Sequence, residues 1–74
     1  MKITDKMIGD WLVEKRTKRG MTQQEVADKL GCTRVAVHSW ETAKRSMYAE
    51  TLFAYCKAID ADPNDLIPDI MRKL

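Results

Sequence analysis

The feature that most constrains the fold is a glycine, Gly31, which separates two short segments with helical chemistry. The segment before it reads TQQEVADKL, and the segment after it reads CTRVAVHSW. Glycine adopts the left-handed backbone conformation without steric cost, so it can end one helix and redirect the chain. We therefore predict two short helices that cross at a steep angle, as in a helix-turn-helix unit.

Capping residues predict the bounds of both helices. Thr22 and Glu25 form the capping-box pattern T-x-x-E, which predicts a helix from residue 23 to about residue 30. Thr33 is a second N-cap candidate and opens a helix from residue 34 to residue 41 or 42. Helical spacing places its residues on two faces. The inward face holds Ala36, Val37 and Trp40, and the outward face holds Arg34, Val35, His38, Ser39 and Thr42.

Three further helices are expected around this pair. The first runs from residue 4 or 5 to residue 18, carries basic residues near its end, and stops before Gly20. The fourth runs from about residue 49 to residue 59. The fifth begins with Asp62 as N-cap and Pro63 at its first position, and we expect Pro68 to stop it after Ile67. The inward candidates on these helices and on the 23–30 helix are Ile8, Trp11, Leu12, Lys15, Val26, Ala27, Leu30, Leu52, Phe53, Tyr55, Cys56 and Ile59.

The chain of 74 residues is expected to form one all-α domain, a compact five-helix bundle whose core spans residues 5–67. Residues 68–74 are expected to be a short turn or a frayed tail. No apolar run approaches the length of a membrane span, and charges interrupt the N-terminus, so we expect a soluble cytoplasmic protein. Two cysteines far apart and a single histidine fit no zinc spacing, so we expect neither a metal site nor a cofactor.

The charge is uneven along the chain. Residues 1–47 hold ten basic against six acidic residues, whereas residues 48–74 hold three against five. Such asymmetry is a weak indication of a basic face that meets an acidic polymer, because charges often only solvate a surface.

At this level of detail the chain resembles the lambda-repressor-like (Cro/Xre) helix-turn-helix DNA-binding domains. The resemblance covers about residues 8–67 and rests on MTQQEVADKLGCTRVAVHSWETAKR followed by ETLFAYCKAIDADPNDLI. It implies that the 34–42 helix enters the major groove of double-stranded DNA. The positions that match the family pattern in register are Gln23, Ala27, Gly31, Thr33, Val37, Trp40 and Glu41.

The outward face of the 34–42 helix supplies the candidates for base contacts. Arg34 can form a bidentate fork on guanine, and Val35 either meets a thymine methyl or is an exposed valine. His38 either donates to a base or phosphate or is only solvated, and Ser39 is short enough that a contact through water is expected.

Other matched positions are assigned to the DNA backbone or to architecture. The resemblance implies that Arg16 and Glu41 form a structural ion pair. Phosphate contacts set register rather than sequence choice. The candidates for them are Gln23, Thr33 (which also serves as a cap), Thr42, Lys44 and Arg45. The resemblance also implies that Gln23 braces the first residues of the 34–42 helix.

Two positions depart from the family pattern, because many relatives have glycine where Ala43 stands and proline near Met47. Alanine disfavours positive φ, so we expect the loop after the 34–42 helix to take another shape.

We expect a sequence-specific transcriptional regulator, a repressor that binds a palindromic operator as a homodimer. The dimer-interface candidates are Leu66, Ile67, Ile70 and Met71, which alternatively only close the core. The rival interpretation is an antitoxin or protein-interaction module with secondary DNA binding. No acid–base pair, activated nucleophile or phosphate loop is visible, so we expect neither an enzyme nor a small-molecule substrate.

Overall fold

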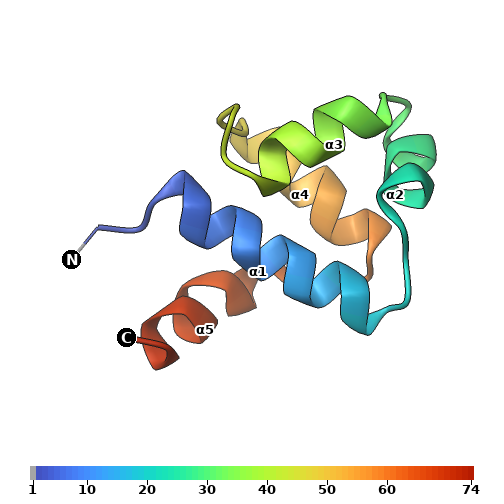
Figure 1. Ribbon diagram of the computed structural model, residues 1–74. Helices are drawn as coiled ribbons and strands as arrows, with labels where there is room; N and C mark the ends of the chain where they lie inside the picture. The colour runs from blue at the N-terminus through green and yellow to red at the C-terminus, as the bar shows by residue number, and fades with distance from the viewer. Residues whose placement is uncertain (1) are drawn as a thin grey trace.

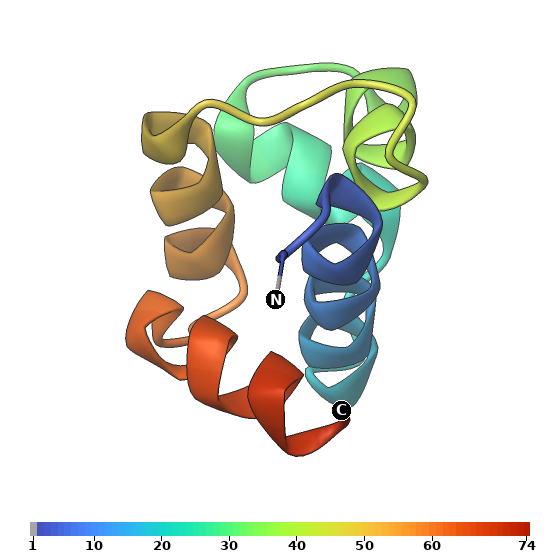
Figure 2. The ribbon, with the colours of Figure 1, turned by 90° about the vertical axis from the view of Figure 1, so that its left-hand side faces the viewer.

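The computed structural model describes residues 2–74 and contains five α-helices and one 3-10 turn in that range. The elements are α1 (Asp5–Lys18), α2 (Gln23–Leu30), α3 (Arg34–Glu41), α4 (Ala49–Ala58), η1 (Pro63–Asp65) and α5 (Leu66–Arg72). In Figure 1, α1 crosses the molecule with α2 and α3 on one side and α5 on the other. Figure 2 shows that α4 closes the side opposite α1. The all-α, five-helix prediction is confirmed.

Side-chain caps are present at three helix starts, and those at Thr22 and Thr33 confirm the predictions. The Thr4 side chain accepts a hydrogen bond from the Met7 N–H, and Thr33 accepts one from the Ala36 N–H. Thr22 and Glu25 make both hydrogen bonds of a capping box. These contacts satisfy N–H groups that have no partner within a helix, so local sequence alone sets where α1, α2 and α3 begin.

Four helices end in the same way, with one residue in the left-handed conformation. In each case the following residue donates its N–H to the carbonyl five positions back, at 2.9 to 3.2 Å, which is the Schellman arrangement. Glycine occupies the left-handed position after α1 and α2, as predicted. The four positions are Gly20 (φ 67°), Gly31 (φ 69°), Ala43 (φ 62°) and Asp60 (φ 55°).

The core lies where α1, α2, α3 and α4 meet, and α5 covers its lower side as seen in Figure 2. Leu12, Val26, Val37 and Tyr55 are fully buried there, one from each of the first four helices. Each comes from the inward stripe that helical spacing predicts. The other buried apolar residues are Trp11, Ala27, Cys56, Ile59, Leu66 and Ile70.

One predicted core residue is on the surface. Phe53 is 56% exposed, because the inward stripe of α4 is formed by Tyr55, Cys56 and the half-buried Leu52, followed by Ile59. Phe53 is displaced from that stripe by one helical position, which turns it toward solvent.

The predicted end of the last helix is also wrong. The chain makes the 3-10 turn η1 and then continues as α5 to Arg72, with Pro68 inside the first turn of α5. Proline is tolerated there because N–H groups of a first turn lack helical partners. Residues 68–72 are therefore helix rather than a frayed tail, and Ile70 anchors them in the core.

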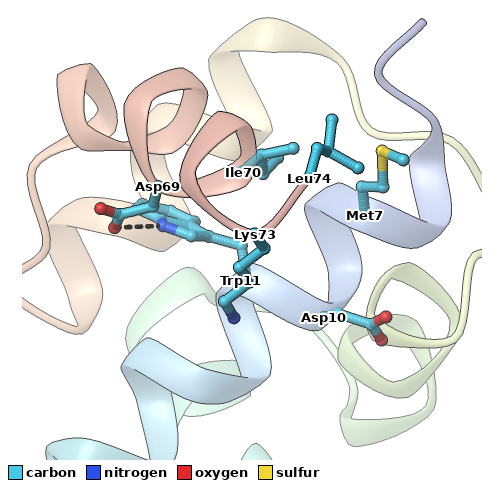
Figure 3. Close-up of a pocket in the computed structure, with 7 residues that line it drawn as sticks. All are labelled: Met7, Asp10, Trp11, Asp69, Ile70, Lys73 and Leu74. Atoms are coloured by element: carbon cyan, nitrogen blue, oxygen red, sulfur yellow. Dashed lines mark hydrogen bonds between the residues drawn. The ribbon is translucent and has the colours of Figure 1, made fainter.

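Helix α5 is attached to α1 by polar contacts as well. The Trp11 Nε1–H donates to Asp69 Oδ2 at 2.9 Å, and Lys15 Nζ lies 3.1 Å from the same oxygen. Lys73 makes an ion pair with Glu14. Beside these contacts, a cavity of about 160 Å³ opens between α1 and α5, lined by Met7, Asp10, Trp11, Asp69, Ile70, Lys73 and Leu74 (Figure 3).

Candidate nucleic-acid interface

The corner between α2 and α3 has the geometry of a helix-turn-helix unit. Gly31 ends α2 in the left-handed conformation, and the chain begins α3 at Arg34 after the Thr33 cap. Val26, Ala27 and Val37 are fully buried at the inside of the corner. Since alanine at position 27 adds little bulk, α2 and α3 can pack closely, and α3 projects to one edge of the molecule (Figure 1).

The outward face of α3 is accessible to solvent. Arg34, His38 and Thr42 are exposed, Val35 is 65% exposed, and Ser39 is half-buried. All four residues predicted to contact bases (34, 35, 38 and 39) therefore lie together on one accessible helical surface. A helix of this size fits the width of the DNA major groove.

Gln23, at the start of α2, lies between this surface and the core. Its Nε2 donates to Glu41 Oε1 at 2.9 Å and lies 3.4 Å from His38 Nδ1. Its Oε1 accepts from Arg34 at 3.3 Å. The residue predicted to bind phosphate thus also contacts two residues of the outward face.

Beneath Gln23, the Glu41 carboxylate joins four helices. It is only 4% exposed. It accepts from Arg16 Nε at 2.8 Å and Arg16 Nη2 at 3.0 Å, and also from the Tyr55 hydroxyl and Gln23. Arg16 in addition donates to the Met21 carbonyl at 2.8 Å. We refer to Arg16, Gln23, Glu41 and Tyr55 as the Glu41 network.

The Glu41 network keeps its carboxylate ionised. Burial by itself raises the pKa of Glu41, but the hydrogen bonds from Arg16, Tyr55 and Gln23 outweigh burial and hold that pKa below its ordinary value. Burial and the hydrogen bond to Glu41 raise the pKa of Tyr55, so this phenol remains a donor. A buried charge with this many donors is costly to leave unpaired, which makes the network structural.

The loop after α3 carries two of the predicted phosphate contacts. Lys44 and Arg45 are exposed, and their backbone N–H groups donate to the Ser39 carbonyl at 2.9 and 3.2 Å. The Thr42 hydroxyl donates to the His38 carbonyl at 2.8 Å. The expectation that alanine at position 43 changes the loop is wrong, since Ala43 adopts φ 62°. The helix-ending hydrogen bonds hold it there despite the steric cost of Cβ.

The dimer-interface candidates divide into two pairs. Leu66 and Ile70 are 7% and 5% exposed and belong to the cluster of buried core residues. They are therefore not available to a second chain. Ile67 and Met71 are 51% and 52% exposed and lie one helical turn apart on the outer side of α5.

Sequence reasoning missed two architectural contacts. The backbone of Gly9 approaches the end of α3 so closely that a Cβ atom would lie 2.5 Å from the Glu41 carbonyl oxygen. Tyr55 was expected to be inward, but its hydroxyl contact with Glu41 was not foreseen. A glycine inside a helical stripe is the signal that could have indicated the first contact, and the second joins residues on different helices that no local pattern relates.

Other classes of site are not evident in residues 2–74. In that range no three His, Cys, Asp or Glu side chains gather as metal ligands. Within the same residues, no helix is long and apolar enough to cross a bilayer.

Comparisons with known proteins agree with this geometry. The sequence profile of a helix-turn-helix family, HTH_3, matches residues 12–66. No curated protein matches the sequence. An XRE-family like protein from Pseudomonas syringae pv. tomato is 29% identical with a TM-score of 0.83, over 93% of this chain and 84% of that one.

Two further solved structures share the fold at lower identity. The clp gene regulator ClgR from C. glutamicum is 19% identical with a TM-score of 0.88, over 100% of this chain and 96% of that one. The restriction-modification controller protein C.Esp1396I, as a tetramer with its natural 35-base-pair operator, is 17% identical with a TM-score of 0.83, over 97% and 95% of the two chains. Because the family profile spans most of the sequence and the fold agrees, the chain belongs to the helix-turn-helix family of Cro/Xre type, a family of DNA-binding transcription regulators.

Proposed function

We propose that this protein is a repressor that binds a palindromic operator as a homodimer, with the outward face of α3 in the major groove of each half-site. The observation that carries the proposal is the exposed outward face of α3, on which Arg34, Val35 and His38 are all accessible. The end of this helix is held in place by the hydrogen bond from Gln23 to Glu41. Such a face provides both hydrogen-bond donors and an apolar contact for base edges.

Within this proposal, Arg34 contributes most of the sequence choice. It lies at the first turn of α3, where its guanidinium can reach guanine O6 and N7. Val35 then meets a thymine methyl, and His38 and Ser39 contact neighbouring bases directly or through water.

The remaining contacts are to phosphate and set the register of α3. The N–H groups at the start of α2, next to Gln23, favour an anion, and Thr33 is the N-cap at the start of α3, where N–H groups favour an anion in the same way. Lys44 and Arg45 extend these contacts along the backbone from the loop after α3. Thr42 lies between the two regions.

A homodimer is proposed because one recognition helix covers few base pairs, and two-fold pairing is the usual route to adequate specificity. C.Esp1396I, which shares the fold, is a tetramer on its operator. In the present chain, Ile67 and Met71 supply exposed apolar surface on α5 for such pairing.

The first experiment selects bound sequences from a pool of random duplexes, which yields a motif, its symmetry and its half-site spacing together. The selected duplex and a scrambled duplex are then titrated at two salt concentrations. We expect steep salt dependence for both and a preference for the selected duplex of at least about 10³-fold. Equal and weak binding to both duplexes would favour a protein-interaction module instead.

The Arg34→Ala variant tests the assignment of base contacts. We expect the preference to fall about fivefold or more, because a bidentate arginine–guanine pair gives about 1–3 kcal/mol of discrimination. The affinity for the scrambled duplex and the melting temperature of the protein should change little. Arg72→Ala is the matched control, since it removes one exposed arginine from α5. Equal weakening on both duplexes would show that Arg34 contacts only phosphate.

A further inference from the structure

Gln23 connects the base-reading surface to the buried Glu41 carboxylate. One end of its amide donates to Glu41 Oε1 at 2.9 Å, and the other end accepts from Arg34 at 3.3 Å. The amide therefore spans the distance between a group that is almost fully buried and one that is exposed. No other residue in 2–74 hydrogen-bonds to both Glu41 and Arg34 through its side chain.

The carboxylate dictates which way the amide points. An ionised carboxylate only accepts hydrogen bonds, whereas an amide has a donor end and an acceptor end fixed in one plane. Gln23 must therefore turn its NH₂ group toward Glu41, which leaves Oε1 facing outward. The outward oxygen is the group that an arginine, which has only donors, can bind.

We propose that Glu41 is a positioning residue for DNA recognition, which acts through the Gln23 amide to hold the Arg34 guanidinium in the direction of the major groove. This proposal rests on the proposed base contact of Arg34. The bond to Gln23 uses only one of the five N–H groups of arginine, so four remain, and two of these suffice for a bidentate contact with guanine. Pre-ordering a long side chain also reduces the entropy lost when it binds.

The arrangement gives Glu41 a role that differs from that of its neighbours in the network. Tyr55 donates to the Glu41 oxygen that does not contact Gln23, so removing the Tyr55 hydroxyl leaves the Gln23 contact in place. Replacing Glu41 with glutamine has the opposite effect, because a neutral amide can present either its oxygen or its NH₂ group. Gln23 can then flip and turn its own NH₂ group toward Arg34, where two donors oppose each other.

The experiment compares Glu41→Gln with the control Tyr55→Phe, which also loses a buried hydrogen bond of the network. Both variants are checked for helical content and used well below their melting temperatures. The readout is the ratio of the dissociation constants for a scrambled and for the selected duplex. We expect Glu41→Gln to lower this preference about fivefold or more, within the range that one arginine–guanine pair provides, and Tyr55→Phe to leave it within about twofold.

A second variant keeps the test decisive if Glu41→Gln does not fold. Gln23 is only half-buried, so Gln23→Ala should fold. Loss of a phosphate contact alone would weaken both duplexes equally, whereas loss of the positioning contact lowers the preference itself. We expect the preference to fall in Gln23→Ala, and to fall no further when Arg34→Ala is added than in Arg34→Ala alone.

The outcomes separate this inference from the proposed function. If Arg34→Ala leaves the preference unchanged, the proposed base contact is wrong and the positioning role is wrong with it. If Arg34→Ala lowers the preference but neither Glu41→Gln nor Gln23→Ala does, the base contact stands and the positioning role is overturned. An equal loss in Tyr55→Phe and Glu41→Gln would also overturn it, because general loosening of the network would then explain both.

Discussion

Gly9 of α1 lies against the backbone of Glu41 at the end of α3, and a Cβ at position 9 would come within 2.5 Å of the Glu41 carbonyl oxygen. The oxygen belongs to the main chain, so it cannot rotate away. We expect Gly9→Ala to lower the free energy of unfolding by about 1–3 kcal/mol, although alanine favours helix by about 1 kcal/mol. Chemical denaturation measures the change, and Asp10→Ala at the adjacent exposed position is the control. A stability equal to that of the unchanged protein would contradict the close approach.

Ala43 provides the opposite case, in which a substitution by glycine should stabilise. Its φ of 62° costs an L-residue about 1–2 kcal/mol. Glycine would relieve this strain, but part of the gain is lost because glycine also makes the unfolded chain more flexible. We expect Ala43→Gly to raise the free energy of unfolding by about 0.5–1 kcal/mol. Gly31→Ala, whose Cβ would meet no atom within 4 Å, isolates the same strain with the reverse sign. A loss of stability in Ala43→Gly would show that the loop does not adopt this conformation in solution.

Acid should destabilise the fold through Glu41. Hydrogen bonds from Arg16, Tyr55 and Gln23 hold the pKa of Glu41 below its ordinary value of 4.5 despite burial. A carboxyl whose pKa is lower in the folded state stabilises it above the ordinary pKa, and this stabilisation is lost as the pH falls through the lowered value. We therefore expect the free energy of unfolding to fall below about pH 4.5.

Two other carboxyl groups contribute to the same pH range and must be separated from Glu41. Hydrogen bonds from Lys73 lower the pKa of Glu14, and the hydrogen bond from Trp11 followed by that from Lys15 lowers the pKa of Asp69. Both groups are more accessible to solvent than Glu41, so salt screens their ion pairs more strongly. Urea titrations at high salt from pH 3 to pH 6 measure how the free energy of unfolding changes with pH. We expect this free energy to fall with falling pH in the unchanged protein and not in Glu41→Gln. The same slope in both proteins would assign the acid sensitivity elsewhere.

Self-association should depend on the exposed pair on α5. We expect Ile67→Glu or Met71→Glu to weaken the proposed homodimer about fivefold or more, because each places a charge in an apolar contact worth about 1–2 kcal/mol. Sedimentation equilibrium measures the dissociation constant of the homodimer. Phe53→Glu is the matched control because Phe53 is similarly exposed on α4. Binding of one monomer to an isolated half-site should not change. If only the Phe53 variant dissociates, the interface lies on α4.

Local sequence chemistry accounts for most of the helix bounds. The capping box of Thr22 and Glu25, the Thr33 cap, and the left-handed glycines at positions 20 and 31 are all present as predicted. These features work because each depends only on residues within one turn. The family resemblance, which the profile match confirms, agrees with these local predictions for α2 and α3.

The predictions that fail depend on contacts between distant segments. Pro68 reads locally as a stop, yet α5 continues because Ile70 and the Trp11–Asp69 hydrogen bond attach it to the core. Ala43 reads as unsuited to a left-handed turn, yet the hydrogen bonds that end α3 hold it in one. The Gln23 contact with Arg34 agrees with the bracing that the family resemblance implies, whereas its contact with Glu41 lies beyond local patterns, since it joins the start of α2 to the end of α3.

The short length of α3 has an evolutionary consequence. A free peptide of eight residues would scarcely be helical in water, so this helix owes its order to the groups beneath it. Its solvent-facing positions contribute little to that order and can therefore be exchanged at small cost in stability. Under the proposed function, descendants of one ancestral regulator can in this way acquire new target sites by a few replacements at positions such as Val35 and His38, while the scaffold that presents them stays the same.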